Sequence, residues 1–359
     1  MKIKIEEKLE WGKLATFILN KKEPIYNWFY FKKGFSKDLV FNLIYNFNLK
    51  SNDWVLDPFC GSGTTLLACK QFGINSIGFD ILPVAVFVSN VKTRDYDINE
   101  LKIISKKILK NKFQKISFEF PTLMKRAFNK YALEDIAFFK NEINKIENKN
   151  NRNFFLLALM NAAMKISYAW KDGDIIKIRK KNVQPLKFVF NRTIHKMIKD
   201  LENFKTKKCE IKVEQCDAKR MKIGNNTIDS IITSPPYLNQ TDYTKIYEIE
   251  NLFIDEYEKP DPNSYIGFGD NTKEKYFNDM KIVLEEMYRV CKDNAKIAIV
   301  IGNGYISGKI IESDIILSQM AEDVGFVVKK IFVLNKRFAI EKRTKKKGIL
   351  RESLIILRK

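Results

Sequence analysis

The sequence predicts an α/β fold: a mostly parallel sheet of seven strands, an antiparallel hairpin at its C-terminal end, and a mainly helical insertion. Short apolar strands alternate with helices in residues 53–93 and again in residues 208–334. This alternation is typical of parallel sheets that are covered by helices. Residues 96–204 are instead rich in Lys and Asn and follow a helical period. We therefore assign residues 1–95 and 205–359 to one α/β domain that is interrupted by this insertion.

The predicted elements follow in order along the chain. An aromatic-rich segment leads to a helix from Ser36 to Phe47, for which Ser36 is a suitable N-cap. Two βα units come next: strand DWVLD, helix TTLLACKQFG, strand NSIGFD and helix LPVAVFVSNVKT. After the insertion, strands CEIKVEQCDA and TIDSIIT precede helix EKYFNDMKIVLEEMYRVCK and strand AKIAIVIGN. Helix ESDIILSQMAEDVGF is followed by strands VVKKIFVLNKR and ESLIILRK, which we expect to pair as the hairpin.

The charge balance and the cysteines limit the class of protein. Lys and Arg number 64 against 43 Asp and Glu, which gives a net charge of +21. Such an excess favours a polyanionic partner, above all nucleic acid, although a Lys-rich compositional bias would produce it too. The five cysteines form no CxxC pair and there is one histidine, so we expect neither a structural zinc site nor disulfides, and a cytoplasmic location. The same cysteine and histidine pattern leads us to expect no metal. We expect no membrane association, because no signal peptide or apolar span is visible.

A glycine-rich turn, DPFCGSGTT, follows the first strand of the α/β region. It places Asp57 at the strand end and Gly61 and Gly63 just beyond it, where ligands bind in open α/β sheets. A dinucleotide fingerprint would have a third glycine at Leu66, and no Gly-Lys-Ser/Thr of a P-loop follows. The pattern therefore favours an adenosyl ligand without phosphates, a tight structural turn being the alternative.

Two further acids end neighbouring strands. Asp80 ends the second strand and could accept hydrogen bonds from both hydroxyls of a ribose. Asp217 follows the third strand and could accept from an adenine amino group, or could be an ordinary surface aspartate.

DPFCGSGTT and TSPPY together resemble the amino-methylating DNA methyltransferases, which make N4-methylcytosine or N6-methyladenine from S-adenosylmethionine. The resemblance covers residues 24–95 and 205–359 and implies a Rossmann-like class I methyltransferase fold. It implies cofactor-binding roles for Asp57, Phe59, Cys60, Gly61, Gly63, Asp80 and Asp217, and catalytic roles for Ser234, Pro235, Pro236 and Tyr237. A looser match of FSKDLVFNLI to the family's N-terminal motif places Phe35 and Ser36 beside the methionine end of the cofactor.

The chemistry explains why such a motif needs these residue types. An exocyclic amino nitrogen is a poor nucleophile because its lone pair is delocalised into the ring. The Ser234 side chain and the Pro235 carbonyl can each accept one of its N–H groups, provided that both acceptors are held still. Two prolines fix φ at both positions. Tyr237 can stack on the target base, which must be flipped out of the duplex to reach the site.

The resemblance also bears on the target. SPPY is commoner among the N4-cytosine enzymes and DPPY among the N6-adenine enzymes, so cytosine N4 is the expected target and adenine N6 the alternative. tRNA guanine-N2 methyltransferases share the DPFCGSG turn, but their catalytic motif usually begins with Asp or Asn, and a large RNA-binding domain usually precedes it, whereas only residues 1–56 precede Asp57 here. A non-catalytic nucleic-acid-binding protein is a third reading. Carbon-5 cytosine methylation is disfavoured, because the chain contains no Pro-Cys dipeptide.

The expected partner is double-stranded DNA in a prokaryotic cytoplasm, at the nucleoid, together with a cognate restriction endonuclease or other components of a defence system. The insertion is the candidate target-recognition region. Basic residues in the insertion and in the C-terminal loop could contact phosphates, or could form an ordinary solvated face; they are Lys177, Arg179, Lys180, Lys181, Arg343 and Lys345.

Overall fold

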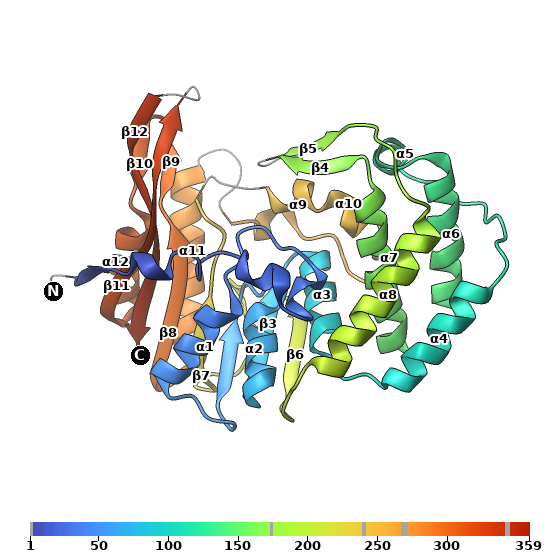
Figure 1. Cartoon of the computed structure of the whole chain (residues 1–359). Coiled ribbons are helices and arrows are strands. Elements are labelled where there is room, and N and C mark those ends of the chain that lie inside the picture. The colour runs from blue at the N-terminus through green and yellow to red at the C-terminus, as the bar shows by residue number, and fades with distance from the viewer. Residues whose placement is uncertain (1–2, 173–174, 239–241, 267–271, 342–344) are drawn as a thin grey trace.

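A computed structural model describes residues 3–172, 175–238, 242–266, 272–341 and 345–359 (Figure 1). Among these residues, eight strands form one sheet in the order β1-β11-β12-β8-β7-β2-β3-β6. They are β1 (Ile5–Glu7), β2 (Trp54–Asp57), β3 (Asn75–Asp80), β6 (Ile211–Gln215), β7 (Ile228–Thr233), β8 (Cys291–Gly302), β11 (Val327–Glu341) and β12 (Lys345–Arg358). The pairs joining β6, β3, β2, β7 and β8 are parallel, and β12 is antiparallel to both of its neighbours.

The sheet confirms the predicted α/β class. All seven predicted strands are present, and the last two form the predicted antiparallel hairpin. The eighth strand, β1, was not predicted. It pairs in parallel with β11 through three residues only, so β1 rather than β11 forms this edge of the sheet.

Helices cover both faces of the sheet. They are α1 (Lys37–Phe47), α2 (Thr64–Phe72), α3 (Pro83–Thr93), α11 (Thr272–Val290) and α12 (Ser313–Val324). Successive strand residues point to opposite faces. Accordingly, Val55 and Ile232 pack with α1 and α2, whereas Leu56 and Ile231 pack with α11 and α12. As predicted, Ser36 caps α1, and its hydroxyl accepts a hydrogen bond from the Leu39 N–H at 3.4 Å.

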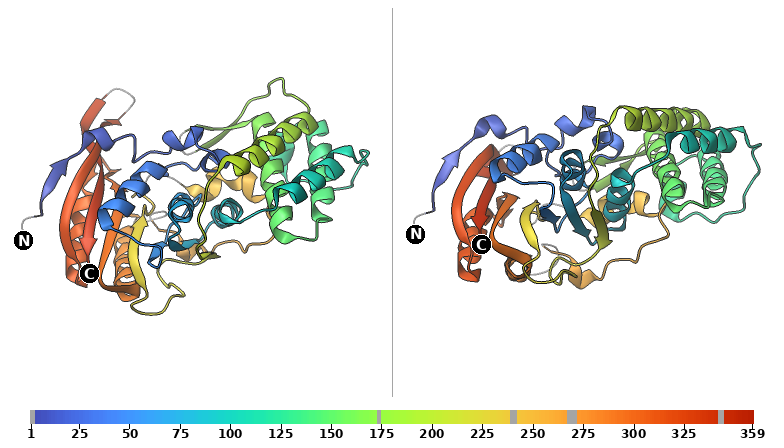
Figure 2. Two further views of the ribbon diagram at one scale, coloured as in Figure 1. Left: turned by 60° about the horizontal axis from the view of Figure 1, so that its bottom comes forward. Right: turned by 90° about the horizontal axis from the view of Figure 1, so that it is seen from below.

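Residues 96–204 contain five helices and a small hairpin within the described part of the chain. They are α4 (Ile98–Lys110), α5 (Thr122–Ala127), α6 (Lys130–Asn144), α7 (Lys149–Ile166), β4 (Ala169–Asp172), β5 (Ile175–Ile178) and α8 (Leu186–Asn203). This helical segment lies at the β6 end of the sheet, and the β11–β12 hairpin lies at the other end (Figure 2). Its apolar side chains form one core with α3 and with Tyr26, Trp28 and Phe29. The segment is therefore packed firmly against the α/β part.

Short elements complete the described chain. They are η1 (Leu9–Trp11), η2 (Leu19–Lys22), η3 (Tyr26–Trp28), α9 (Tyr243–Ile246), α10 (Glu248–Asn251), η4 (Pro262–Ser264), β9 (Gly304–Ile306) and β10 (Lys309–Ile311). None of the helices in the described ranges is long and apolar enough to cross a membrane.

Candidate active site

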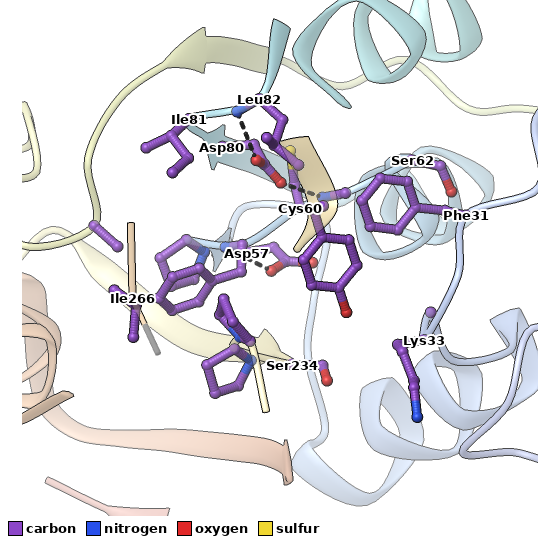
Figure 3. A pocket seen from close by; sticks show the side chains of 18 of the residues that line it. Phe31, Lys33, Asp57, Cys60, Ser62, Asp80, Ile81, Leu82, Ser234 and Ile266 are labelled. Atoms are coloured by element: carbon purple, nitrogen blue, oxygen red, sulfur yellow. Dashed lines mark hydrogen bonds between the residues drawn. The ribbon is translucent and has the colours of Figure 1, made fainter. Parts of the chain in front are cut away.

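One pocket lies at the carboxyl edge of the sheet, and we call it the carboxyl-edge pocket (Figure 3). The parallel strands β2, β3, β6 and β7 all end there, so segments far apart in the sequence meet. The predicted residues that line it are Phe35, Asp57, Phe59, Cys60, Gly61, Asp80, Asp217, Ser234, Pro235 and Pro236. The two sequence motifs therefore face a single cavity.

The glycine-rich turn crosses from β2 to α2 in a backbone conformation that favours glycine. Gly61 has a φ of 50° and Gly63 a φ of 76°, in the left-handed region where side chains are disfavoured. Space is limited too, since a Cβ on Gly61 would lie 2.9 Å from the ring of Phe31, and one on Gly63 would lie 2.8 Å from Ser89 Oγ. Gly63 does not line the pocket; it forms the N-cap of α2.

Asp80 holds this turn in place. Its Oδ2 accepts a hydrogen bond from the Gly61 N–H and its Oδ1 accepts one from the Leu82 N–H, both at 2.9 Å (Figure 3). Burial raises the pKa of Asp80 to about 6, against the effect of these backbone donors.

Asp57 is more deeply enclosed, with 2% of its surface exposed. Its Oδ1 accepts hydrogen bonds from the Phe59 N–H at 3.2 Å and from the Thr233 hydroxyl at 2.6 Å. Burial raises its pKa to about 6, although the hydroxyls of Thr233 and Thr65 oppose the rise. Two neighbouring carboxyls with raised pKa values favour a cationic ligand, because a nearby positive charge would stabilise their ionised forms.

The rest of the lining fits an adenosyl group. Phe59, Ile81, Leu82 and Ile266 provide apolar surface. Asp217 also lines the pocket, and its Oδ1 accepts a hydrogen bond from the Lys219 N–H at 2.9 Å. These residues suit S-adenosylmethionine, which combines a cationic methionine end, a ribose and an aromatic base. The acids would contact the cation and the ribose hydroxyls, and the apolar side chains would contact the base.

The N-terminal motif contributes unevenly. Phe35 lines the pocket together with Lys33 and Gly34. Ser36 is fully buried and does not line it; its hydroxyl accepts from a backbone N–H of α1 instead. Phe35 therefore lies where a ligand could touch it, and Ser36 positions the helix behind.

The SPPY segment is divided between two cavities. Ser234, Pro235 and Pro236 line the carboxyl-edge pocket, but Tyr237 does not. The Tyr237 ring is buried against Gly302, and its hydroxyl donates to Glu352 Oε1 at 2.7 Å. It lines a second cavity, which we call the Tyr237 hollow.

Several residues of the site have no motif that would reveal them in the sequence. The Phe31 ring stacks on Tyr243 and on Tyr247, with interplanar angles of 3° and 9°. Phe31 and Tyr243 line the carboxyl-edge pocket, but they come from segments more than 200 residues apart. Glu352 lies within a predicted strand and carries no local signal of its own. The aromatic richness of the segment around Phe31 was the only available hint.

Four of the predicted DNA-facing residues, Lys177, Arg179, Lys180 and Lys181, line neither of these two cavities. Lys177 is exposed on β5, where it pairs with Asp172 and lies 5.5 Å from the centre of the Trp170 ring. Arg179, Lys180 and Lys181 are exposed in the segment that follows. Arg343 lies outside the described residues, and of Lys345 only the backbone, at the start of β12, is described.

Comparison with known proteins places these features in a family. The family model of the N6/N4 DNA methylases matches residues 8–91 and 228–359. The chain is 28% identical to the Type II methyltransferase M.BsoBI of Geobacillus stearothermophilus, over 90% of this chain and 83% of that protein. It is 25% identical to the Type II methyltransferase M.AvaI of Nostoc, over 93% of this chain and 85% of that protein.

Among solved structures, a SAM-dependent methyltransferase from Methanosarcina mazei is 12% identical and covers 88% of this chain and 96% of its own, with a TM-score of 0.35. That overlap is too low to support an argument. The family model, in contrast, matches both motif-bearing parts of the chain and omits the helical segment between them. The chain therefore belongs to the N6/N4 family of DNA methylases, enzymes that take their methyl group from S-adenosylmethionine.

Proposed function

We propose that this protein is a site-specific DNA methyltransferase that modifies the N4 amino group of a flipped cytosine. One observation carries the proposal: the turn formed by Ser234, Pro235 and Pro236 lines the same pocket as the carboxyl groups of Asp57 and Asp80. An amino group that enters beside Ser234 would thus meet the cavity that suits the cofactor. When bound, S-adenosylmethionine supplies the methyl group.

The residues of this chain would prepare the amino group for attack. The Ser234 side chain and the Pro235 carbonyl each accept one of its N–H groups, which draws the nitrogen lone pair out of the ring. Consecutive prolines limit backbone rotation at both positions, so these acceptors need little reorganisation during the reaction. Asp57 and Asp80 hold the cofactor's cationic end and its ribose, and Asp217 lies where the adenine could bind.

The serine at position 234 supports cytosine over adenine, by the resemblance of SPPY to the N4-cytosine motif. Adenine N6 is the second candidate, because the matching family model covers both amino groups. Both bases offer the same chemical group, so the mechanism is unchanged between them.

The basic residues support a duplex substrate. The β4–β5 hairpin and the β11–β12 hairpin both extend beyond the carboxyl edge of the sheet, from opposite ends of it (Figure 1). Arg179, Lys180 and Lys181 are exposed beside the first hairpin, and Arg337 is exposed on the second. We infer that DNA lies across this edge, with phosphates near both hairpins, and that residues 96–204 contribute to target recognition. Each phosphate contact would steepen the salt dependence of binding.

The relatives named Type II methyltransferases suggest a restriction-modification setting, with a cognate endonuclease as the functional counterpart.

Methyl transfer can be tested directly. The protein is incubated with labelled S-adenosylmethionine and either genomic DNA or tRNA, and the nucleosides are then identified by mass spectrometry. We expect N4-methylcytosine in DNA, within one sequence context that mapping of the modified sites defines. N6-methyladenine would select the second candidate. Label in tRNA alone, or none in either substrate, would overturn the proposal.

Asp57→Asn and Ser234→Ala form a matched pair in this assay. Asp57→Asn should weaken cofactor binding, whereas Ser234→Ala should leave cofactor binding intact and lower turnover.

A further inference from the structure

The β4–β5 hairpin of the helical segment is tied to the α/β part of the chain by one lysine. The hairpin lies above α9 and α10 in Figure 1, and β5 contacts α9. Lys171, on β4, places its Nζ 3.7 Å from the centre of the ring of Tyr247, which lies between α9 and α10. The same Nζ lies 2.6 Å from Glu250 Oε1. A ring and a carboxylate of one segment thus hold a cation of the hairpin.

This contact is shielded from solvent. Tyr247 is fully buried, Glu250 is 4% exposed, and the Lys171 side chain is 21% exposed. Desolvation lowers the pKa of Lys171, while Glu250 acts in the opposite direction. The second carboxylate oxygen of Glu250, Oε2, is buried and has no hydrogen-bond partner among the described residues. A ring attracts a desolvated cation more strongly than a hydrated one, so the ammonium group restrains the Tyr247 ring.

Tyr247 in turn holds Phe31. The two rings are stacked, with centres 5.0 Å apart and an interplanar angle of 9°. The Tyr247 hydroxyl also accepts a hydrogen bond from the Lys32 N–H at 2.7 Å, so Tyr247 holds the backbone directly after Phe31 as well as the ring. Phe31 lines the carboxyl-edge pocket, where its ring lies against Gly61 (Figure 3). The contact that begins on the hairpin therefore ends at the wall of this pocket.

We propose that Lys171 is a positioning residue for cofactor binding: through Tyr247 it holds the Phe31 ring in place at the wall of the carboxyl-edge pocket. The helical segment, most of which lies outside the residues matched by the family model, thereby helps to complete the cofactor site. The inference rests on the assignment of this pocket to the cofactor, and it does not depend on which base is methylated.

Removal of Lys171 alone has two consequences that must be separated. It takes the cation from Tyr247, and it leaves the buried carboxylate of Glu250 unpaired, which strongly destabilises a fold. Replacing both partners, in Lys171→Met/Glu250→Gln, removes the unpaired charge while the cation stays absent. The double variant therefore distinguishes a positioning role from a purely stabilising one.

The test measures the affinity for S-adenosylmethionine by calorimetry without DNA, together with thermal unfolding of the cofactor-free protein. Lys171→Met should lower the unfolding temperature and raise the Kd about 3- to 30-fold, the range of a desolvated cation–π contact. Lys171→Met/Glu250→Gln should recover most of the unfolding temperature and keep the raised Kd. Lys171→Arg, which retains the cation, should recover both.

Lys177→Met is the matched control from the same hairpin. Lys177 also pairs with a carboxylate, that of Asp172, and lies 5.5 Å from the centre of the Trp170 ring. That ring belongs to a residue that is 49% exposed, and none of the three residues lines the carboxyl-edge pocket. The Kd of Lys177→Met for S-adenosylmethionine should therefore equal that of the wild type.

A double-mutant cycle tests the route through Phe31. Phe31→Leu should raise the Kd for S-adenosylmethionine, because it replaces the ring at the pocket wall. Adding Lys171→Met to Phe31→Leu should raise the Kd little further, since residues that act through one another have non-additive effects.

Three outcomes would overturn the inference. A wild-type Kd in Lys171→Met/Glu250→Gln would show that the ion pair acts on stability alone. An equally raised Kd in Lys177→Met would show a general effect of charge. Additive losses from Lys171→Met and Phe31→Leu would exclude action through Phe31.

Failure of the proposed function gives a different result. A protein that shows the expected Kd values but methylates no base in DNA would contradict the proposed function and support this inference. A wild type that binds no S-adenosylmethionine would overturn the assignment of the pocket, and this inference with it.

Discussion

The Thr233 hydroxyl donates to Asp57 Oδ1 over 2.6 Å, although the two residues are 176 positions apart in the chain. Both side chains are buried, at 1% and 2% exposed. Thr233 is the last residue of β7, directly before the Ser-Pro-Pro turn, and Asp57 is the last residue of the neighbouring strand β2. This bond therefore fixes the proposed catalytic turn to the proposed cofactor site.

Thr233→Val should lower both the stability of the fold and the affinity for the cofactor. Valine keeps the shape of threonine but removes the donor, so the Asp57 carboxyl loses one of the groups that favour its ionised form. We expect a loss of about 1–3 kcal/mol in the free energy of unfolding and weaker cofactor binding, measured by chemical denaturation and by calorimetry. Thr233→Ser keeps the hydroxyl and is the control. Equal cofactor affinity in Thr233→Val and Thr233→Ser would contradict the role of this bond.

Asp57→Asn should stabilise the cofactor-free protein. The folded pKa of Asp57 lies near 6, above its ordinary value of 3.8, so stability is lost as the pH rises through this interval. At pH 7 the cost of the buried charge is about 3 kcal/mol, at 1.36 kcal/mol per pKa unit. Asparagine removes that cost while weakening cofactor binding. Urea unfolding at pH 7 measures the gain, and a variant less stable than the wild type would show that the charge is compensated in the fold.

Cofactor binding should depend on pH. The cation of the cofactor favours ionised Asp57 and Asp80, whose pKa values are both raised to about 6. Protonation therefore competes with binding as the pH falls below about 6, and the affinity should drop by up to tenfold per pH unit for each carboxyl. Calorimetric titration between pH 5 and 8 tests this, with Asp57→Asn expected to give a shallower slope. A constant affinity over that range would exclude the electrostatic role of both acids.

Most of the sheet could be predicted from the sequence, because each of its main strands is a local apolar run next to a turn or a helix. β1 could not, since it has three residues and exists only through its pairing with β11. The β4–β5 hairpin was likewise hidden in a segment with a helical period.

Part of the candidate site could be predicted in the same way. Asp57 and Asp80 end parallel strands and Ser234 directly follows one, and the carboxyl ends of such strands meet at one edge of the sheet. The burial of Tyr237 and its bond to Glu352 were not predictable, because they depend on the register between β12 and β8. The sequence indicated a tyrosine available for stacking, whereas its ring is buried to 6% exposure.

A buried lysine under the glycine-rich turn gives a second pH effect. Lys92 of α3 is 2% exposed, donates to the Ser62 carbonyl at 3.0 Å, and has its pKa lowered by burial to about 7. Because the folded state binds this proton less tightly than the unfolded state, stability should rise from pH 7 to 9, by up to about 1.4 kcal/mol per pH unit. Lys92→Met should lack this rise in denaturation experiments at pH 7, 8 and 9. Identical slopes for the two proteins would show that Lys92 is not the titrating group.

Gly302→Ala should impair catalysis without affecting the cofactor. A Cβ at this position would lie 2.6 Å from Cδ2 and 2.7 Å from Cε2 of Tyr237, so the ring must move and its hydroxyl must shift from Glu352. Displacement of a positioned group by about 1 Å can lower the rate on the order of 100-fold. Cofactor affinity should not change, because Tyr237 does not line the carboxyl-edge pocket.

Gly224→Ala is the matched control, since its Cβ would have Thr227 Cγ2 at 3.5 Å, an ordinary contact. Steady-state kinetics on DNA and calorimetry with the cofactor separate the two effects. If Gly302→Ala lost cofactor affinity in proportion to kcat, the distortion would have spread into the cofactor site, and Tyr237 would not act in a separate hollow. If its kcat matched that of Gly224→Ala, the position of the Tyr237 ring would not matter for the reaction.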